Sequence, residues 1–390
     1  MLQTAVGRIV VASVALLAAA VVAGLVVLWP GDSNEVSLVA GSRAQTQQAQ
    51  VVDSRPTACR NPAVDDCRRL SIELRSGPRA GERSFLTVGD AGPAPGLDAG
   101  AQLRVVRNEL PAGADPGVVD PYALVEVDRR SPMLWLLLVF AALVIVFGRL
   151  RGALALVGLG VSVLIVVEFV IPALLEDKPP VAVALVGSFA VMLVTIALAH
   201  GLGPKSLAAM LGTGASLVAT VLLALLFTNV AELTGFSSEE ASLLQANDPT
   251  LSLTGLVLAG MVIGALGVLD DVTVSQASTV MALRSANPAQ RARELYRGAL
   301  SVGRDHVAAT VNTLVLAYAG ASLPVLLVFG IAGTEFADTI NREAVAEQVI
   351  AMLVGSIGLI LAVPVTTALA ACLATRLPAA ELPAAAAHSH

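Results

Sequence analysis

Residues 132–175 read PMLWLLLVFAALVIVFGRLRGALALVGLGVSVLIVVEFVIPALL, with charged side chains only at Arg149, Arg151 and Glu168. This stretch opens a nearly unbroken apolar run that continues to Thr375 and is cut only by short polar joints. A bilayer core is roughly 30 Å thick and requires about 20 apolar residues per helix. A soluble core cannot bury this much Leu, Val and Ala. The run therefore predicts a polytopic α-helical membrane protein.

A further apolar run lies near the N-terminus, at Ile9–Trp29, directly after Arg8. The core of a signal peptide is usually about 7–15 residues long, and this run is longer. We therefore expect an uncleaved membrane anchor, with a cleaved signal peptide as the alternative. Eight spans are expected in all: Ile9–Trp29, Met133–Gly148, Gly152–Leu175, Val181–Ala199, Ser206–Thr228, Leu251–Val274, Val307–Ile331 and Val345–Thr375.

Composition argues against several classes of function. The chain is 56% hydrophobic and 14% charged, far from the usage of soluble domains. Aromatic residues make up 4%, too few to form a stacking surface for nucleic acid, so no nucleic-acid partner is expected. None of the three cysteines has metal-site spacing. The chain also lacks HExxH, GxGxxG and Walker motifs. We therefore predict neither a cofactor nor an enzymatic activity, and the sequence indicates no metal site.

Residues 31–131 are polar and contain no apolar run of spanning length. Short β-like segments recur there between Gly- and Pro-rich turns. Several of them alternate apolar and polar residues, a pattern typical of half-buried strands. About five strands in about 80 residues predict a small β domain resembling the OB fold, a partly open barrel. Because no platform of aromatic side chains for base stacking is visible in it, we expect a structural or partner-binding module. The segments are Gln50–Val52, Leu70–Leu74, Ser84–Val88, Leu103–Val106 and Tyr122–Val127.

Charge alternates between successive connections of the predicted spans. One set of connections carries mainly basic residues: Arg8, Arg149, Arg151, Lys205, Arg284, Arg291, Arg293, Arg297, Arg304 and Arg376. The opposite set carries mainly carboxylates: Glu176, Asp177, Glu232, Glu239, Glu240, Asp248, Glu335, Asp338 and Glu343. Because positive residues favour the cytoplasmic side, we expect both termini in the cytoplasm and the β domain outside.

The predicted organisation has four parts. Residues 1–30 are the anchor, 31–131 the extracytoplasmic β-rich domain, 132–376 the seven-helix membrane domain, and 377–390 an Ala- and Pro-rich tail expected to be disordered.

Two cysteines of the β domain, Cys59 and Cys67, lie eight positions apart. Disulfides persist in oxidising compartments, so the predicted export of this domain favours a Cys59–Cys67 disulfide. Their sequence spacing does not establish the geometry that such a bond requires.

Charged groups inside the predicted spans are the candidates for function. A charge at mid-bilayer costs at least about 2.5–3.5 kcal/mol on insertion scales, so its presence indicates a role. Glu168 lies roughly 24 Å along the helix that begins at Gly152, in the outer half of the membrane. A functional carboxyl group and a structural one near the interface are equally expected there.

Asp270 and Asp271 lie some 30 Å along the helix that begins at Leu251, where a span reaches the cytoplasmic face. The apolar pattern nevertheless continues to Leu283. The segment is therefore either a kinked long helix or a span followed by a half-buried amphipathic helix. In both cases the two carboxylates lie in or near the membrane, with Gln276 on a following turn.

The next span opens with Arg304 and Asp305 and then carries Asn312 and Thr313. The start of this span, at Arg304, lies at the same predicted depth as Asp271. We therefore expect these two side chains to form an ion pair, which offsets part of the cost of burying the charges. The alternatives are that Arg304 is a positive-inside anchor, that Asp305 complements a helix dipole, and that Thr313 bonds back to its own helix.

Three strings in this region are GALGVLDD at Gly264–Asp271, GRDH at Gly303–His306 and NTLVLAYAGASLP at Asn312–Pro324. They resemble the signature stretches of the YibE/F-like family of bacterial integral membrane proteins. The resemblance covers the membrane region from about residue 132 to 375, and the N-terminal anchor with an exported β domain also fits it. It implies a multi-pass protein of the bacterial cytoplasmic membrane and does not identify its substrate.

Within the resemblance, Asp271 matches the acidic position of the family, and Asp270 is an additional acid where the family usually has an apolar residue. Arg304, Asp305, Asn312 and Thr313 match as they stand. His306, the residue after Asp305, departs from the family, because the family typically has an aliphatic residue at this position.

Two hypotheses of different classes follow. The first is a transporter or permease for small solutes or ions, with a polar path lined by Asp271, Asp270, Gln276, Arg304, Asp305, Asn312, Thr313 and Glu168. The second is an accessory or sensor protein whose exported β domain binds an envelope or membrane partner. The surroundings of Asp271 and Arg304 separate them, because only a permease requires a water-filled cavity there. The sequence predicts the lipid bilayer as a partner and gives no oligomeric state.

Overall fold

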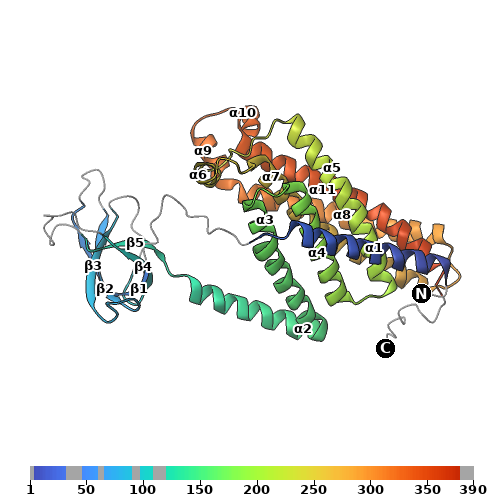
Figure 1. The fold of residues 1–390 in the computed structure, drawn as a ribbon, viewed down its shortest axis with the longest axis horizontal. Coiled ribbons are helices and arrows are strands. Elements are labelled where there is room, and N and C mark those ends of the chain that lie inside the picture. The colour runs from blue at the N-terminus through green and yellow to red at the C-terminus, as the bar shows by residue number, and fades with distance from the viewer. Residues whose placement is uncertain (1–3, 32–45, 60–65, 90–96, 109–119, 378–390) are drawn as a thin grey trace. The chain divides into compact units, whose positions relative to one another are not determined.

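The computed structural model describes residues 4–31, 46–59, 66–89, 97–108 and 120–377 (Figure 1). The contacts divide the chain into two compact units. We call residues 37–143 the β unit, and residues 1–36 together with 144–390 the helical unit. The tail expected to be disordered lies outside the described residues, apart from Leu377.

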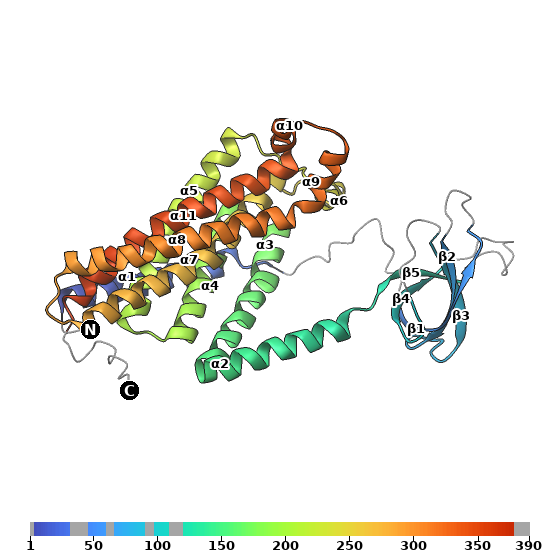
Figure 2. The ribbon, with the colours of Figure 1, turned by 180° about the vertical axis from the view of Figure 1, so that it is seen from behind.

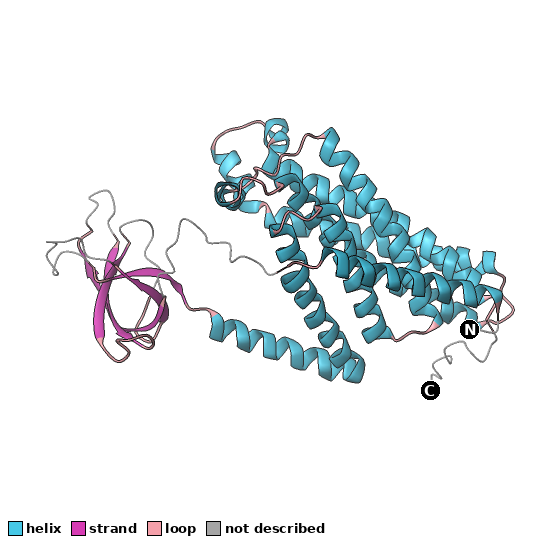
Figure 3. Ribbon diagram, in the orientation of Figure 1, coloured by secondary structure: helices cyan, strands magenta, loops and turns pink. Residues whose placement is uncertain are grey.

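The β unit is a single curled sheet of five antiparallel strands (Figure 3). Its strand order is β3-β2-β1-β4-β5. The long first strand pairs with both β2 and β4, and the two edge strands approach one another, so the sheet forms a half-barrel. Each strand segment predicted from the sequence is confirmed. The strands are β1 (Gln47–Thr57), β2 (Cys67–Leu74), β3 (Arg83–Val88), β4 (Gln102–Arg107) and β5 (Tyr122–Val127).

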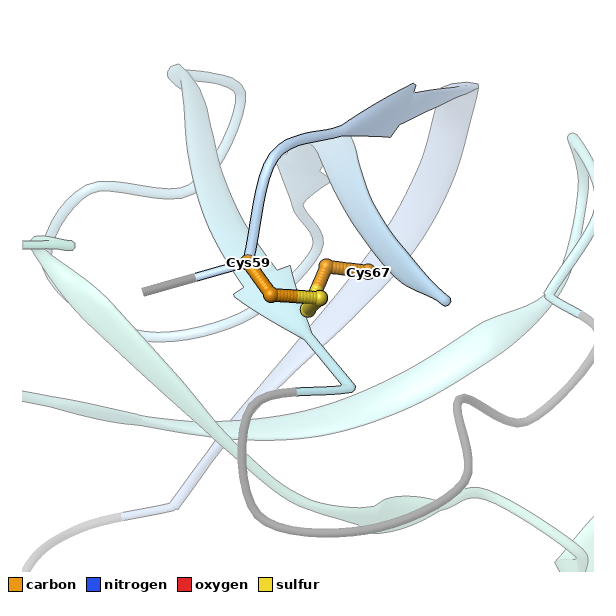
Figure 4. The surroundings of a disulfide bond; sticks show 2 residues. All are labelled: Cys59 and Cys67. Atoms are coloured by element: carbon orange, nitrogen blue, oxygen red, sulfur yellow. A yellow bond between two sulfur atoms is a disulfide. The ribbon is translucent and has the colours of Figure 1, made fainter. Parts of the chain in front are cut away.

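Alternation of side chains builds the core of the β unit. Leu70, Ile72 and Leu74 of β2 point inward and are at most 1% exposed, as expected when successive side chains of a strand point to opposite faces. A disulfide joins Cys59 to Cys67 with a Cα–Cα distance of 5.2 Å (Figure 4). It links the segment after β1 to the first residue of β2.

The helical unit is built from long apolar helices (Figures 1 and 2). Six helices of the described chain are long and apolar enough to cross a membrane, and α8 with α9 makes a seventh candidate if this pair, bent by 57°, is one span. The elements are α1 (Ala5–Leu28), α2 (Arg130–Ile165), η1 (Val166–Val170), α3 (Ile171–Leu175), α4 (Pro180–His200), α5 (Pro204–Val230), α6 (Glu239–Asn247), α7 (Leu253–Ala286), α8 (Ala292–Ala321), α9 (Leu323–Ile331), α10 (Phe336–Asn341) and α11 (Glu343–Ala374).

Two breaks interrupt this helical pattern near residues that the sequence marks as polar or helix-breaking. The backbone of α2 leaves helical geometry at Arg149 (φ 52°, ψ −133°), inside the joint predicted between two spans. Further along, η1 is a π-helical turn just before Pro172. Proline has no N–H to donate to the carbonyl of Glu168 four residues earlier, which explains why the regular ladder of hydrogen bonds gives way there.

The segment that contains both aspartates is one long helix. Ser252 caps α7 by accepting a hydrogen bond from the Gly255 N–H at 3.1 Å, and the helix then runs unbroken to Ala286. The alternative of a span followed by a separate amphipathic helix is therefore wrong. The apolar pattern continues past the aspartates because this helix packs along its length against α5 and α11.

Small residues let the three central helices, α5, α7 and α11, approach closely. A Cβ added at Gly212 of α5 would lie 2.1 Å from Thr366 Oγ1 of α11, and one added at Gly358 of α11 would lie 2.2 Å from Thr220 Oγ1 of α5. Close contact of this kind drives helix association in lipid, where no hydrophobic effect operates between helices. Around this core, α4 packs on α7, and α8 packs on α7 and α11.

Candidate functional site

Helix α4 presents two polar side chains on one face. Ser188 and Thr195 are its only polar residues before His200, and a separation of seven residues places them two turns apart on the same side. Ser188 is 1% exposed, and its Oγ has no hydrogen-bond partner in the described part of the chain. A buried hydroxyl without a partner is costly, and Thr228, Ser356 and Thr366 of the described residues share this state; Ser188 is of interest because of what it faces.

Asp270 of α7 faces these residues. It lies near the middle of a helix about 50 Å long. The Thr195 hydroxyl donates to Asp270 Oδ2 at 3.1 Å. The second carboxylate oxygen, Oδ1, is buried and has no partner among the described residues. Half of this carboxylate therefore has its hydrogen-bonding capacity unused.

A cavity of about 400 Å³ lies between α2, η1, α4 and α7, and Asp270, Ser188 and Thr195 are among its lining residues. Its walls are otherwise mainly aliphatic. Helix α4 and η1 approach closely at the cavity, where Gly187 and Val170 both line it. A Cβ added at Gly187 would lie only 2.7 Å from Val170 Cγ2. π-Helical turns occur frequently at functional sites, and here the turn supplies part of the cavity wall.

A second layer of hydrogen bonds fixes the backbone of this site. The Thr273 hydroxyl lies 3.1 Å from the Asp270 carbonyl oxygen, to which it donates, and 2.5 Å from the Thr213 hydroxyl of α5. Both threonines are fully buried. This chain of contacts holds the turn that carries Asp270 against α5 and leaves its carboxyl group directed toward α4.

The expected ion pair between Asp271 and Arg304 is not formed, and both side chains are exposed. Gln276 marks the side of α7 that faces α8, because its amide donates to the Ala299 carbonyl at 2.7 Å. Asp271 precedes Gln276 by five residues, which turns it about 140° away from that side. Gly303 packs against Gln276, so Arg304 is turned about 100° away in its own helix.

Asp271 instead lies within electrostatic range of His200 at the end of α4. Arg151 and Lys205 also act on His200. These charged groups therefore lie near the C-terminal end of α4. The two neighbouring aspartates therefore differ in environment, one beside a cavity and the other among exposed charges.

The remaining predicted path residues do not assemble into one site. Glu168, Asp305, Asn312 and Thr313 are exposed. Thr313 donates to the carbonyl of its own helix four residues earlier at 3.0 Å, which matches the alternative proposed for it from the sequence. Gln276 is 3% exposed and serves as a brace between α7 and α8. Of the eight candidates, only Asp270 lines the cavity.

The described residues contain no group of three or more His, Cys, Asp or Glu side chains that could hold a metal ion. A profile for a family described as YibE/F-like protein matches residues 136–376. The chain belongs to the YibE/F-like family. The match covers the helical elements from α2 to α11, including every residue of the cavity. No curated protein and no solved structure matches the chain.

In this YibE/F-like protein, sequence reasoning missed Ser188 and Thr195. The signal was available, because two isolated polar residues seven positions apart in an apolar run share a helix face. It was weak, because a lone Ser or Thr in a span commonly bonds back to its own helix. Thr195 also lies 2.9 Å from the Val191 carbonyl, so only the position of Asp270 identifies it as part of a site.

Proposed function

We propose that this YibE/F-like protein is a permease that moves small solutes or ions across the bacterial cytoplasmic membrane through a path that includes Asp270. The observation that carries the proposal is a carboxylate on an apolar helix, beside a cavity, with one buried oxygen that has no hydrogen-bond partner among the described residues. Ionisable residues inside spans are rare and mark substrate, ion or proton pathways. A purely structural carboxylate would have its hydrogen bonds satisfied.

The hydrogen bonds of Thr195 support this proposal, because they can change when a solute binds. The hydroxyl lies 2.9 Å from the Val191 carbonyl, 3.2 Å from the Met192 carbonyl and 3.1 Å from Asp270 Oδ2. It has one proton to donate, so it satisfies either the carboxylate or its own helix. A solute that binds the Asp270 carboxylate frees the Thr195 hydroxyl to donate to a carbonyl of its own helix, α4. Binding and release then change a contact between two helices.

The proposal includes a topology of eight spans with both termini in the cytoplasm and an OB-like β unit outside. Division of α2 at Arg149 gives two spans, and the bent pair of α8 and α9 gives another. The joint at Arg149 and Arg151 carries the positive charge that favours the cytoplasmic side. Single cysteines at Glu82 and at Arg291 test this, because a membrane-impermeant maleimide should label only position 82 in intact cells. Labelling of position 291 alone contradicts the topology.

Flux through purified protein in liposomes tests the function. We would screen metal ions, small anions and organic cations, and compare Asp270→Asn with Asp271→Asn as a matched control on the adjacent, exposed position. We expect Asp270→Asn to reduce flux at least about tenfold, since truncation of one partner of a buried charge interaction costs about 2–5 kcal/mol. Asp271→Asn should retain most of the flux. Equal flux in wild type and Asp270→Asn would reject this path.

A further inference from the structure

The cavity beside Asp270 is apolar except for a few groups. Ten of its fourteen lining residues are aliphatic or glycine, and the four polar ones are Ser162, Ser188, Thr195 and Asp270. Ser162 donates to the Gly158 carbonyl of its own helix at 2.8 Å, and Thr195 donates as described above. Two polar atoms of the lining, Asp270 Oδ1 and Ser188 Oγ, have no hydrogen-bond partner within the part of the chain that the structure describes. The cavity therefore combines one acid with walls of hydrocarbon.

This lining suits an inorganic ion poorly. Calcium takes six to eight oxygen ligands, and magnesium demands near-octahedral oxygen coordination and retains several waters. The cavity offers one carboxylate and three hydroxyls, two of which are engaged. An inorganic ion that lost its hydration shell in this cavity would recover little of its free energy of hydration. An organic cation is hydrated weakly and brings apolar surface that the aliphatic walls can cover.

We propose that the cavity binds a hydrophobic monovalent organic cation, such as a substituted amine or a quaternary ammonium or phosphonium compound, with its charge beside Asp270. Its apolar groups would contact Leu159, Val191 and Leu266, which line the cavity. This inference rests on the proposed function and names the substrate class of the same site. A volume of about 400 Å³ lies within the roughly 300–1,000 Å³ usual for small-molecule sites. Such sites combine mostly apolar walls with a few placed polar groups.

The exposure of the cavity wall supplies a route for such a ligand. Leu159 and Val163 line the cavity, yet they are 49% and 55% exposed. The cavity is therefore bordered by the apolar outer surface of the helical unit. Hydrophobic cations partition from water into the bilayer, so this ligand can reach Asp270 from the lipid.

Equilibrium binding of tetraphenylphosphonium to the full-length protein in lipid nanodiscs tests the proposal. We expect saturable binding by wild type, a loss of at least about tenfold in affinity in Asp270→Asn, and a change of less than about twofold in Asp271→Asn. Tetraphenylborate has the same shape and the opposite charge, so it should show no saturable binding. Magnesium in excess should not displace the bound cation.

Two further variants separate a binding defect from a folding defect. Asp270→Glu keeps the charge and should retain saturable binding. Val191→Phe fills the cavity and leaves the carboxylate, so it should weaken binding while the protein stays monodisperse. The proposal is overturned if wild type does not bind tetraphenylphosphonium, if Asp270→Asn binds it like wild type, or if tetraphenylborate binds equally well. A phospholipid that native mass spectrometry finds bound, and that the cation cannot displace, also overturns it.

Flux measured in parallel separates this inference from the proposed function. If another solute crosses in an Asp270-dependent manner and wild type does not bind tetraphenylphosphonium, transport stands and the ligand class is wrong. If tetraphenylphosphonium binds through Asp270 while no solute crosses, the ligand class stands and the transport function is wrong.

Discussion

Replacement of Gly212 by alanine tests the packing on which the helical unit depends. The new Cβ would lie 2.1 Å from Thr366 Oγ1, 2.8 Å from Thr366 Cβ and 3.1 Å from Thr366 Cα. Ordinary contacts of this kind lie at 3.4–4 Å. Rotation of the threonine side chain moves Oγ1, but it leaves Cβ and Cα in place. Helices α5 and α11 must therefore move apart by several tenths of an ångström.

The expected cost follows from two opposing terms. Overpacking of a close contact costs typically about 1–3 kcal/mol, and the contact with the helix backbone places Gly212→Ala toward the upper end. Alanine returns about 0.5–1 kcal/mol relative to glycine within a helix. We expect a net loss of about 1–2 kcal/mol in the free energy of unfolding. Reversible unfolding in mixed micelles with increasing sodium dodecyl sulfate measures this quantity.

Gly260→Ala is the matched control, because a Cβ added at Gly260 of α7 meets nothing within 4 Å. This variant should be neutral or more stable by up to about 1 kcal/mol. The reasoning fails if Gly212→Ala is as stable as Gly260→Ala, because the close approach of α5 to α11 would then not exist in the folded protein.

Three other predictions concern single contacts. Gln276→Leu removes the 2.7 Å hydrogen bond between α7 and α8 and should lower the free energy of unfolding by about 0.6–1.7 kcal/mol. Unchanged stability in the same micelle assay would show that this hydrogen bond does not stabilise the contact between the two helices. The side-chain hydrogen bond from Arg130 lowers the pKa of Asp128 to about 2, so any stabilisation by this carboxylate is complete above its ordinary pKa of 3.8 and is lost as the pH falls through 2. Carbon-detected NMR should find that low midpoint, and Arg130→Gln should return it toward 3.8. Non-reducing peptide mapping should recover Cys59 linked to Cys67, and free thiols at both positions in exported protein would exclude the bond.

Much of the secondary structure was predictable from local patterns. The five short segments predicted in the β unit lie within five observed strands, because several of them show the alternation of apolar and polar residues that a half-buried strand requires. The long apolar runs lie within helices for a similar reason, since a hydrophobic run in lipid must satisfy its backbone internally. The break at Arg149 falls in a polar joint visible in the sequence.

The candidate site was only partly predictable. Asp270 was among the candidates, but the greater weight fell on Asp271 and on a pair with Arg304. Two adjacent residues of a helix point about 100° apart, so one can line a cavity while its neighbour remains exposed. No local pattern in α7 separates them, because apolar residues precede and follow both.

The sequence by itself therefore determined where the long apolar helices and the five strands lie, that a joint falls at Arg149, and which few polar groups lie inside apolar runs. Only the tertiary structure decided that Asp270 meets Thr195 and Ser188 of α4, that Gln276 serves as a brace, and that Arg304 has no acidic partner on α7. The physical reason is the rotation of each helix about its axis. That rotation is set by close contacts such as Gly212 against Thr366, which join residues far apart in the chain.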